Sequence, residues 1–209
     1  MGSCALWELC DGQRLKLTTF RRGKGKDLYN IISDKEKLKQ VTQLDFNRKF
    51  TQRRICYTND KRKWVNKQMM DSEEKRASRN KTKLLRLGAV PFDKNSQDVR
   101  LTKGTPAIAR KNDRDLDLCN SESFTVTKIN VKEELLEMTE EGGDRVLHIP
   151  FDDFQKLFYV AWCITLHKSQ GCTFDHEYTI HEMDHPRFDA RAKYVALSRS
   201  TTLEYIKVW

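Results

Sequence analysis

The sequence lacks long apolar runs, a secretory leader and paired cysteine motifs. No stretch approaches the roughly 18 consecutive apolar residues of a membrane-spanning helix, and the mean hydropathy is -0.75. The opening residues 1–4 are not part of a basic segment followed by an apolar one, as a secretory signal requires. The six cysteines include no C-x-x-C pair. We therefore expect an intracellular protein in a reducing compartment, with neither a membrane partner nor a disulfide framework.

A phosphate-binding loop of the G-x-x-x-x-G-K-[ST] type is also absent. Gly23-Lys24 and Gly25-Lys26 lack both the earlier glycine and the following Ser or Thr. In P-loop enzymes that loop and its lysine hold the β- and γ-phosphates together with Mg²⁺. Asp152-Asp153 follows Pro150-Phe151 and is not a convincing Mg²⁺-binding pair at a strand end. The sequence therefore does not contain a complete NTP site of this class.

Positive charge is abundant. The 209 residues include 39 Lys and Arg against 30 Asp and Glu, which gives a net charge of +9 and an isoelectric point near 9.2. Such a balance suits a nucleic acid or an anionic membrane surface. The length allows one sizeable core, or a core with a small inserted module.

The most informative stretch runs from Trp162 to Ser200. The apolar run Val160–Leu166 predicts a buried strand, and it leads into the polar turn of Thr165–Gly171 (TLHKSQG). Ligands of α/β sheets bind at the carboxyl ends of strands, so this turn is a candidate binding site. The stretch closes with Tyr194–Arg199 (YVALSR). An arginine in that position is suited to phosphate contact and to stabilising charge in phosphoryl transfer.

These two segments resemble the late motifs T-x-H-K-S-Q-G and Y-V-A-L-S-R of superfamily 1 helicases, in the RecD-like and Pif-type branch. They occur in the family's order and rough separation, which makes the pair a specific signal. The resemblance covers nearly the whole chain from about Leu6 and implies the carboxy-terminal half of an ATP-dependent DNA helicase. The implied fold is α/β: a RecA-like parallel sheet of the P-loop NTPase type with an inserted small Src-homology-3-like β-barrel.

The resemblance also implies roles for individual residues. Arg199 and Arg21 would act in catalysis by contacting the γ-phosphate of ATP, and Gln170 and Gly171 would sense the nucleotide from the same side of the cleft. Mg²⁺ would be held mainly by a first RecA-like domain that is absent from this sequence. The residues implied to grip single-stranded DNA or RNA are Thr165, His167, Lys168, Ser169, Thr58 and Asn59.

Two of these assignments have ordinary structural alternatives. Arg21 lies in Leu17–Arg22 (LTTFRR), which resembles the family's L-x-x-x-(aromatic)-R segment, but a simple basic turn explains it as well. Arg53–Asp60 predicts a strand and a turn before a helix over 61–79, and it resembles the family's (apolar)-Y-T-N segment. A helix cap formed by Asn59 or Asp60 explains these residue types equally well.

The pattern changes beyond Leu87, where Pro and Gly punctuate short stretches of β character. Several short strands separated by turns suggest a small antiparallel barrel, which is what the family carries at this place. Cys119-Asn120-Ser121-Glu122 replaces the family's usual Asn-Gly. The expected strands are 99–102, 106–109, 124–129, 135–139 and 146–149. The expected division is 1–90 for the first part of the second RecA-like domain, 91–158 for the barrel and 159–209 for the return to the RecA-like domain.

His181–His185 (HEMDH) matches the H-E-x-x-H pattern of zinc metalloproteases. That chemistry needs two imidazoles one helical turn apart and the glutamate as general base. The context is unfavourable, because Glu177–His181 alternates like a strand and Pro186 disfavours helical geometry at His185. The context therefore argues against zinc proteolysis, and we assign no metal site. The main alternative to the helicase half is a stand-alone, non-catalytic nucleic-acid-binding module, which the net charge and the absent phosphate loop favour.

Overall fold

The computed structural model describes residues 26–209, so Arg21 and the segment around it lie outside the described residues. A four-stranded parallel sheet forms one part of the fold, with the order β11-β10-β1-β9. Every residue of β10 and β11 is buried, as expected for a parallel sheet covered on both faces. The strands are β1 (Arg53–Cys56), β9 (Cys163–Thr165), β10 (Tyr178–Ile180) and β11 (Ile206–Val208).

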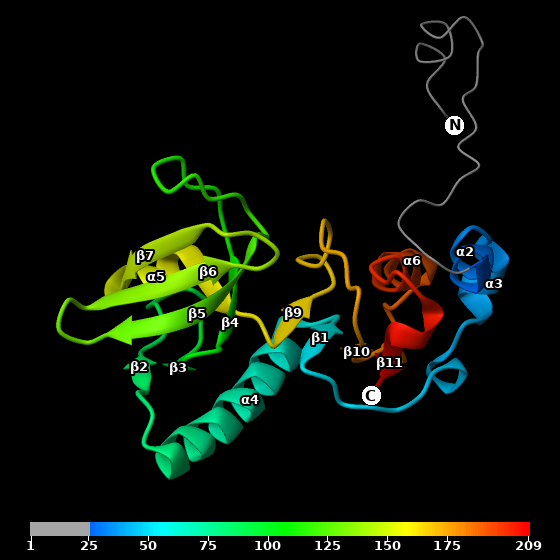
Figure 1. The fold of residues 1–209 in the computed structure, drawn as a ribbon. Helices are drawn as coiled ribbons and strands as arrows, with labels where there is room; N and C mark the ends of the chain where they lie inside the picture. Colours follow the sequence, from blue (N-terminus) through cyan, green and yellow to red (C-terminus); the bar gives the residue numbers. More distant parts are fainter. Residues whose placement is uncertain (1–25) are drawn as a thin grey trace, which may run out of the picture.

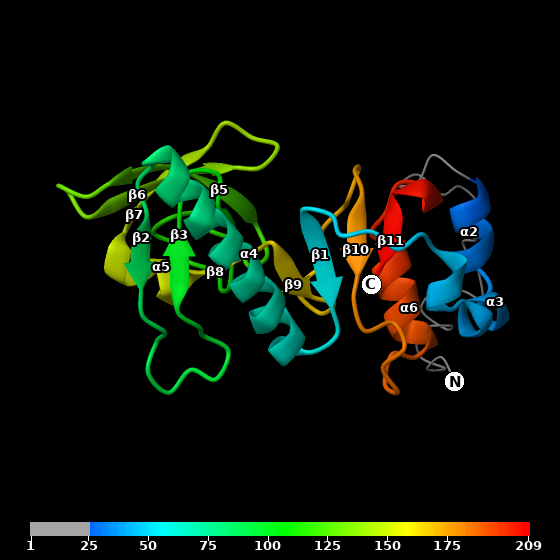
Figure 2. The same ribbon diagram turned by 90° about the horizontal axis from the view of Figure 1, so that it is seen from below.

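Helices lie on both sides of this sheet. In Figure 2, α2, α3 and α6 gather beside β11, whereas the long α4 lies toward β9. Residues 26–40 form two short helices, and Asp34 caps the second, α3, by accepting hydrogen bonds from the amides of Glu36 and Lys37. The α-helices here are α2 (Lys26–Ile32), α3 (Lys35–Gln40), α4 (Asn59–Asn80) and α6 (Ala190–Leu197), with short 3-10 turns at Gln43–Asp45 and Leu203–Tyr205.

A five-stranded antiparallel sheet, ordered β7-β6-β5-β4-β8, forms the second part (Figure 1). Its own core contains Phe124, Phe154 and Phe158. The ring centroid of Phe158 lies 5.6 Å from that of Phe124 and 5.8 Å from that of Phe154. Its strands are β4 (Pro106–Ala109), β5 (Ser123–Asn130), β6 (Leu135–Glu140), β7 (Val146–Pro150) and β8 (Phe158–Val160). A separate two-stranded sheet pairs β2 (Leu85–Leu87) with β3 (Val99–Leu101).

The structure corrects two expectations in this region. The sequence did not indicate α5 (Phe151–Leu157), which buries Phe154 and Leu157 against the antiparallel sheet. The expected single strand over 160–166 is two strands, because β8 pairs antiparallel with β4 and β9 pairs parallel with β1. The chain therefore changes sheets at residues 161–162.

The completely buried Asn66 of α4 holds this change of sheet in place. Its amide nitrogen donates to the carbonyls of Val160 at 3.2 Å and Cys163 at 2.9 Å, and its amide oxygen accepts from the Cys163 N–H at 2.9 Å. Buried backbone groups need partners, and one side chain supplies partners to both strand ends. Among residues 26–209, no helix combines the length and apolar character needed to cross a bilayer.

Candidate nucleic-acid interface

The turn after β9 is held by its own backbone and by one buried side chain. The N–H of Ser169 donates to the Thr165 carbonyl at 3.0 Å, and the Ser169 hydroxyl donates to the Leu166 carbonyl at 2.7 Å. Ser169 is completely buried. The structure therefore places Ser169 inside the turn, whereas Thr165, His167 and Lys168 line a cavity beside it.

That cavity has a volume of about 170 Å³ and also receives Asn59 from the start of α4. The parallel pairing of β1 with β9, which sets Cys56 opposite Thr165, brings the two segments together at the carboxyl ends of both strands. One segment contributes Asn59, and the other, far away in the sequence, contributes Thr165, His167 and Lys168. The sequence analysis named each of the four as a candidate contact for a nucleic-acid strand. The structure thus gathers four of the six residues implied to bind nucleic acid around one cavity.

Lys168 is half-buried at this cavity. Burial lowers the pKa of its ammonium to about 8, the nearby Arg110 acts in the same direction, and Cys172 opposes them. Its Nζ contacts Oδ1 of Asn120. Asn120 belongs to the segment that replaces the family's usual Asn-Gly turn, so the loop between β4 and β5 reaches the candidate site.

Thr58 has a different role from its neighbour Asn59. Its hydroxyl oxygen accepts from the Lys61 N–H at 3.2 Å and caps α4, so the cap is Thr58 rather than Asn59 or Asp60. The hydroxyl proton is directed to the Glu182 carboxylate at 2.8 Å. The Asn59 amide oxygen instead accepts from Nε of Arg62 at 3.2 Å.

Arg62 is a cavity residue that the sequence analysis missed. It is only 4% exposed, and its Nη2 donates to the Asn95 carbonyl at 2.5 Å. Its guanidinium lies 4.7 Å from the ring centroid of Tyr159, and burial lowers its pKa. Its Nη1 has no hydrogen-bond partner among residues 26–209. The one signal in the sequence was its position three residues after Asn59 on an expected helix.

Arg199 lies against the same turn from the other side. Its Nη1 donates to the Cys172 carbonyl at 3.4 Å, and its Nε donates to the Val195 carbonyl at 3.1 Å. Cys172 directly follows Gly171, whose φ of +97° suits glycine. The second motif thus contacts the residue that directly follows the first, and a guanidinium lies next to the glycine end of the turn. Gln170 faces a different cavity of about 490 Å³, which it shares with His167.

The H-E-x-x-H segment does not form the helix that a zinc protease needs. Residues 181–185 form an irregular turn, and Glu182 has a φ of +60°. His181 is buried, and burial together with Lys61 and Arg54 lowers its pKa to about 4. In the part of the chain that the structure describes, no group of three His, Cys, Asp or Glu side chains could hold a metal ion. The Glu182 carboxylate instead binds the Tyr57 and Thr58 amides at 2.9 and 2.8 Å.

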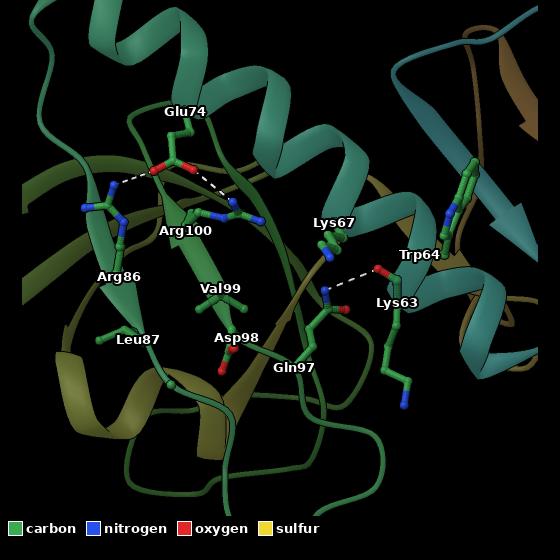
Figure 3. A pocket seen from close by; sticks show the side chains of 11 residues that line it. Lys63, Trp64, Lys67, Glu74, Arg86, Leu87, Gln97, Asp98, Val99 and Arg100 are labelled. Carbon is green, nitrogen blue, oxygen red and sulfur yellow. Dashed lines mark hydrogen bonds and ion pairs between the residues drawn. The ribbon is translucent and has the colours of Figure 1, made fainter.

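A larger cavity of about 800 Å³ lies between α4 and the β2–β3 pair (Figure 3). In it, Glu74 lies between Arg86 and Arg100 and forms an ion pair with each of them. None of the residues that the sequence singled out lines this cavity. We therefore place the candidate interface at the smaller cavity, where the motif residues meet.

Comparison with known proteins gives the fold class. No protein-family model and no curated protein sequence matches the chain. Among solved structures, Bacteroides Pif1 bound to single-stranded DNA is 21% identical with a TM-score of 0.61, over 93% of this chain and 51% of that one. A Bacteroides Pif1 complex with ADP-AlF3 and single-stranded DNA is 21% identical with a TM-score of 0.56, over 93% of this chain and 51% of that one. Pif1 helicase from Candida albicans is 15% identical with a TM-score of 0.60, over 94% and 56%.

The chain therefore has a mixed α/β fold of the RecA-like class. More specifically, it has the fold of the carboxy-terminal half of Pif1-type superfamily 1 helicases, as the sequence motifs predicted. It spans about half the length of these solved helicases.

Proposed function

We propose that this chain is the part of a Pif1-type DNA helicase that grips single-stranded DNA. The observation that carries the proposal is the shared cavity of Asn59, Thr165, His167 and Lys168. These side chains offer an amide, a hydroxyl, an imidazole and an ammonium, which are groups that contact a sugar-phosphate backbone. Structures of similar fold include Pif1 proteins bound to single-stranded DNA. Because the contacts are to backbone, binding is insensitive to base sequence and weakens with salt.

The same proposal extends to a nucleotide site beside the Gly171 turn. Arg199 is held at this turn by the Cys172 carbonyl, and a guanidinium is chemically suited to a γ-phosphate. Gln170 and Gly171 would complete this side of the site, with Arg21 contributing from outside the described residues. ATP and Mg²⁺ would be held mainly by a first RecA-like domain. When bound, ATP would supply the hydrolysis energy, and the arginines would stabilise charge on the leaving phosphoryl group.

We further propose that the antiparallel sheet is a Src-homology-3-like barrel inserted into the RecA-like domain, over residues 91–158. Residues 1–90 and 159–209 would then form one domain. The support is that β1 and β9, on either side of this insertion, pair in one parallel sheet, while the β4–β8 region has a separate aromatic core.

The second candidate, a module that binds nucleic acid without catalysis, is favoured by the net charge of +9. ATP hydrolysis distinguishes the two. We expect no hydrolysis by the 209-residue chain alone and stimulated hydrolysis when a Pif1-type first RecA-like domain is added. Absence of hydrolysis with that domain would support the stand-alone module.

Strand binding tests the interface itself. We expect the chain to bind a fluorescent single-stranded oligonucleotide, with affinity that falls as salt rises. The Lys168→Ala and His167→Ala variants should bind more weakly. Lys35→Ala is the matched control, since Lys35 is exposed on α3 away from the cavity. Equal affinities for Lys168→Ala, His167→Ala and Lys35→Ala would contradict the proposed interface.

A further inference from the structure

A second cavity, of about 490 Å³, neighbours the candidate interface. His167 lines both cavities. Tyr57 also lines the second cavity, as does Gln170, which the proposed function places beside the nucleotide. One wall comes from α6 and the segment that leads into it. Val195 of this wall belongs to the Tyr194–Arg199 motif, whereas residues 187–192 belong to no motif singled out from the sequence.

Two arginines dominate the charge of this wall. Arg187 and Arg191 are both exposed and both line the cavity. Within residues 26–209, neither guanidinium has a hydrogen bond or an ion pair. The carboxylate that lines the same cavity, Asp189, accepts from the Ala192 N–H at 2.9 Å as the cap of α6. The charged side chains that line the cavity are thus two guanidiniums and one carboxylate, so its net charge is positive.

The position of Arg191 does not serve the stability of its helix. Arg191 lies in the first turn of α6, which contains no acidic residue. A cation at a helix N-terminus is opposed by the helix dipole, whereas an anion there is favoured. Arg191 is exposed and its guanidinium has no partner among residues 26–209, so its charge is available to a ligand.

We propose that the Arg187–Arg191 cavity binds backbone phosphates of the same single strand, continuing its path past His167. The inference rests on the proposed function. Its occupant is identified by charge: the cavity is cationic, and it shares His167 with the cavity where the strand is proposed to be held. Arginine matches a phosphate through two parallel hydrogen bonds. The strand would thus be held on both sides of His167, by Lys168 on one side and by the two arginines on the other.

The test is the salt dependence of oligonucleotide binding to the full 209-residue chain. Each phosphate contact on a single strand contributes about 0.7 to the slope of log K against log salt. The double variant Arg187→Gln/Arg191→Gln should therefore lose about 1.4 from the magnitude of that slope. The matched control is Lys103→Gln/Lys132→Gln, which removes the same charge from exposed turns beside the antiparallel sheet. A slope for the double variant equal to that of the control would overturn the proposal.

Three further measurements separate the alternatives. Binding of a fluorescent ATP analogue shows whether the cavity takes a strand phosphate or a nucleotide phosphate. If Arg187→Gln/Arg191→Gln loses analogue binding while its strand binding is unchanged, the proposal is overturned. Arg191→Gln should leave the melting temperature unchanged or raise it, while Arg191→Lys should restore most of the salt slope. A variant that binds weakly only because it melts at lower temperature would contradict a ligand role. If the unaltered chain binds no strand, the proposed function itself is wrong. If the unaltered chain binds the strand and the double variant has the same salt slope, only the inference about the two arginines is wrong.

Discussion

The Glu182 carboxylate holds the start of α4 by accepting from both the amide and the hydroxyl of Thr58, each at 2.8 Å. Thr58 follows β1, and Glu182 follows β10, two strands that pair in parallel. The acid that fits a protease motif in the sequence is therefore a structural anchor between the ends of neighbouring strands. It fixes the backbone from which Asn59 reaches the cavity of the candidate interface.

The first prediction concerns this anchor. Glu182→Ala should lower the free energy of unfolding by about 1–3 kcal/mol, because partly buried amides and a hydroxyl lose their acceptor. Chemical denaturation measures this change. Glu133→Ala is the control, since Glu133 is exposed in the turn between β5 and β6. An unfolding free energy equal to that of the control would contradict the anchoring role. Zinc bound to the pure protein and lost when His181 or His185 is replaced would contradict it as well.

The second prediction concerns the pH dependence of strand binding. Because the pKa of Lys168 is lowered to about 8, raising the pH from 7 to 9 should neutralise much of this ammonium and weaken binding. The stability contribution has the opposite sign. Between about 8 and the usual pKa of about 10.4, the unfolded chain binds the proton more readily than the folded one. Stability from this group therefore rises with pH in that window while affinity falls.

Anisotropy titrations at several pH values, with thermal unfolding at each, check both signs. Lys168→Arg is the matched variant, because arginine stays charged throughout the range. It should bind the strand with little change between pH 7 and 9. An equal loss of affinity with pH in Lys168→Arg and in the unaltered chain would assign the effect to another group.

The third prediction concerns Asn66 at the crossing between the two sheets. Asn66→Leu leaves the buried Cys163 N–H and two carbonyls without their partner. The free energy of unfolding should therefore fall by about 1–3 kcal/mol. Asn80→Ala, at the exposed end of the same helix, controls for changes in helix propensity. Denaturant unfolding of both variants measures the difference, and similar values would mean that the crossing does not depend on Asn66.

The fourth prediction concerns Arg199. In an enzyme completed by a first RecA-like domain, Arg199→Ala should reduce ATP hydrolysis by about 10³-fold or more, because arginines that stabilise the transferred phosphoryl group have effects of that size. Circular dichroism and strand affinity should change little. Arg199→Lys, which keeps the charge but loses the planar fork, should be intermediate. Unchanged turnover in Arg199→Ala would remove Arg199 from the nucleotide site.

The sequence predicted most strands of both sheets, because alternation and short apolar runs reflect burial that each strand experiences locally. It placed β4, β5, β6 and β7 within a few residues of their observed bounds. It missed α5, whose short segment forms a helix by burying Phe154 and Leu157 against a sheet made by other residues. It also merged β8 and β9, since an apolar run does not show which sheet each half joins.

Some residues of the candidate site were identified from the sequence, and others only from the structure. Thr165, His167, Lys168 and Asn59 were identified by motif, and Arg199 by the second motif that contacts the same turn. The roles of Arg62, Arg187 and Arg191 were not visible, because a lysine- and arginine-rich sequence has many cations and does not mark which of them face a cavity. Only the fold shows that one is buried beside the motif turn and two line the adjacent cavity.

The sequence by itself determined the class of fold, the basic charge and the identity of the two helicase-like motifs, because these depend on local pattern and residue chemistry. The tertiary structure decided which residues meet. Asn66 bonds to Cys163 across 97 residues of sequence, and the Glu182 carboxylate binds Thr58 across 124. Such contacts are set by the parallel register of β9, β1 and β10 and by the packing of α4, and register is a property of the assembled sheet. The sequence motifs therefore identify several residues of the candidate site, but only the fold brings them together.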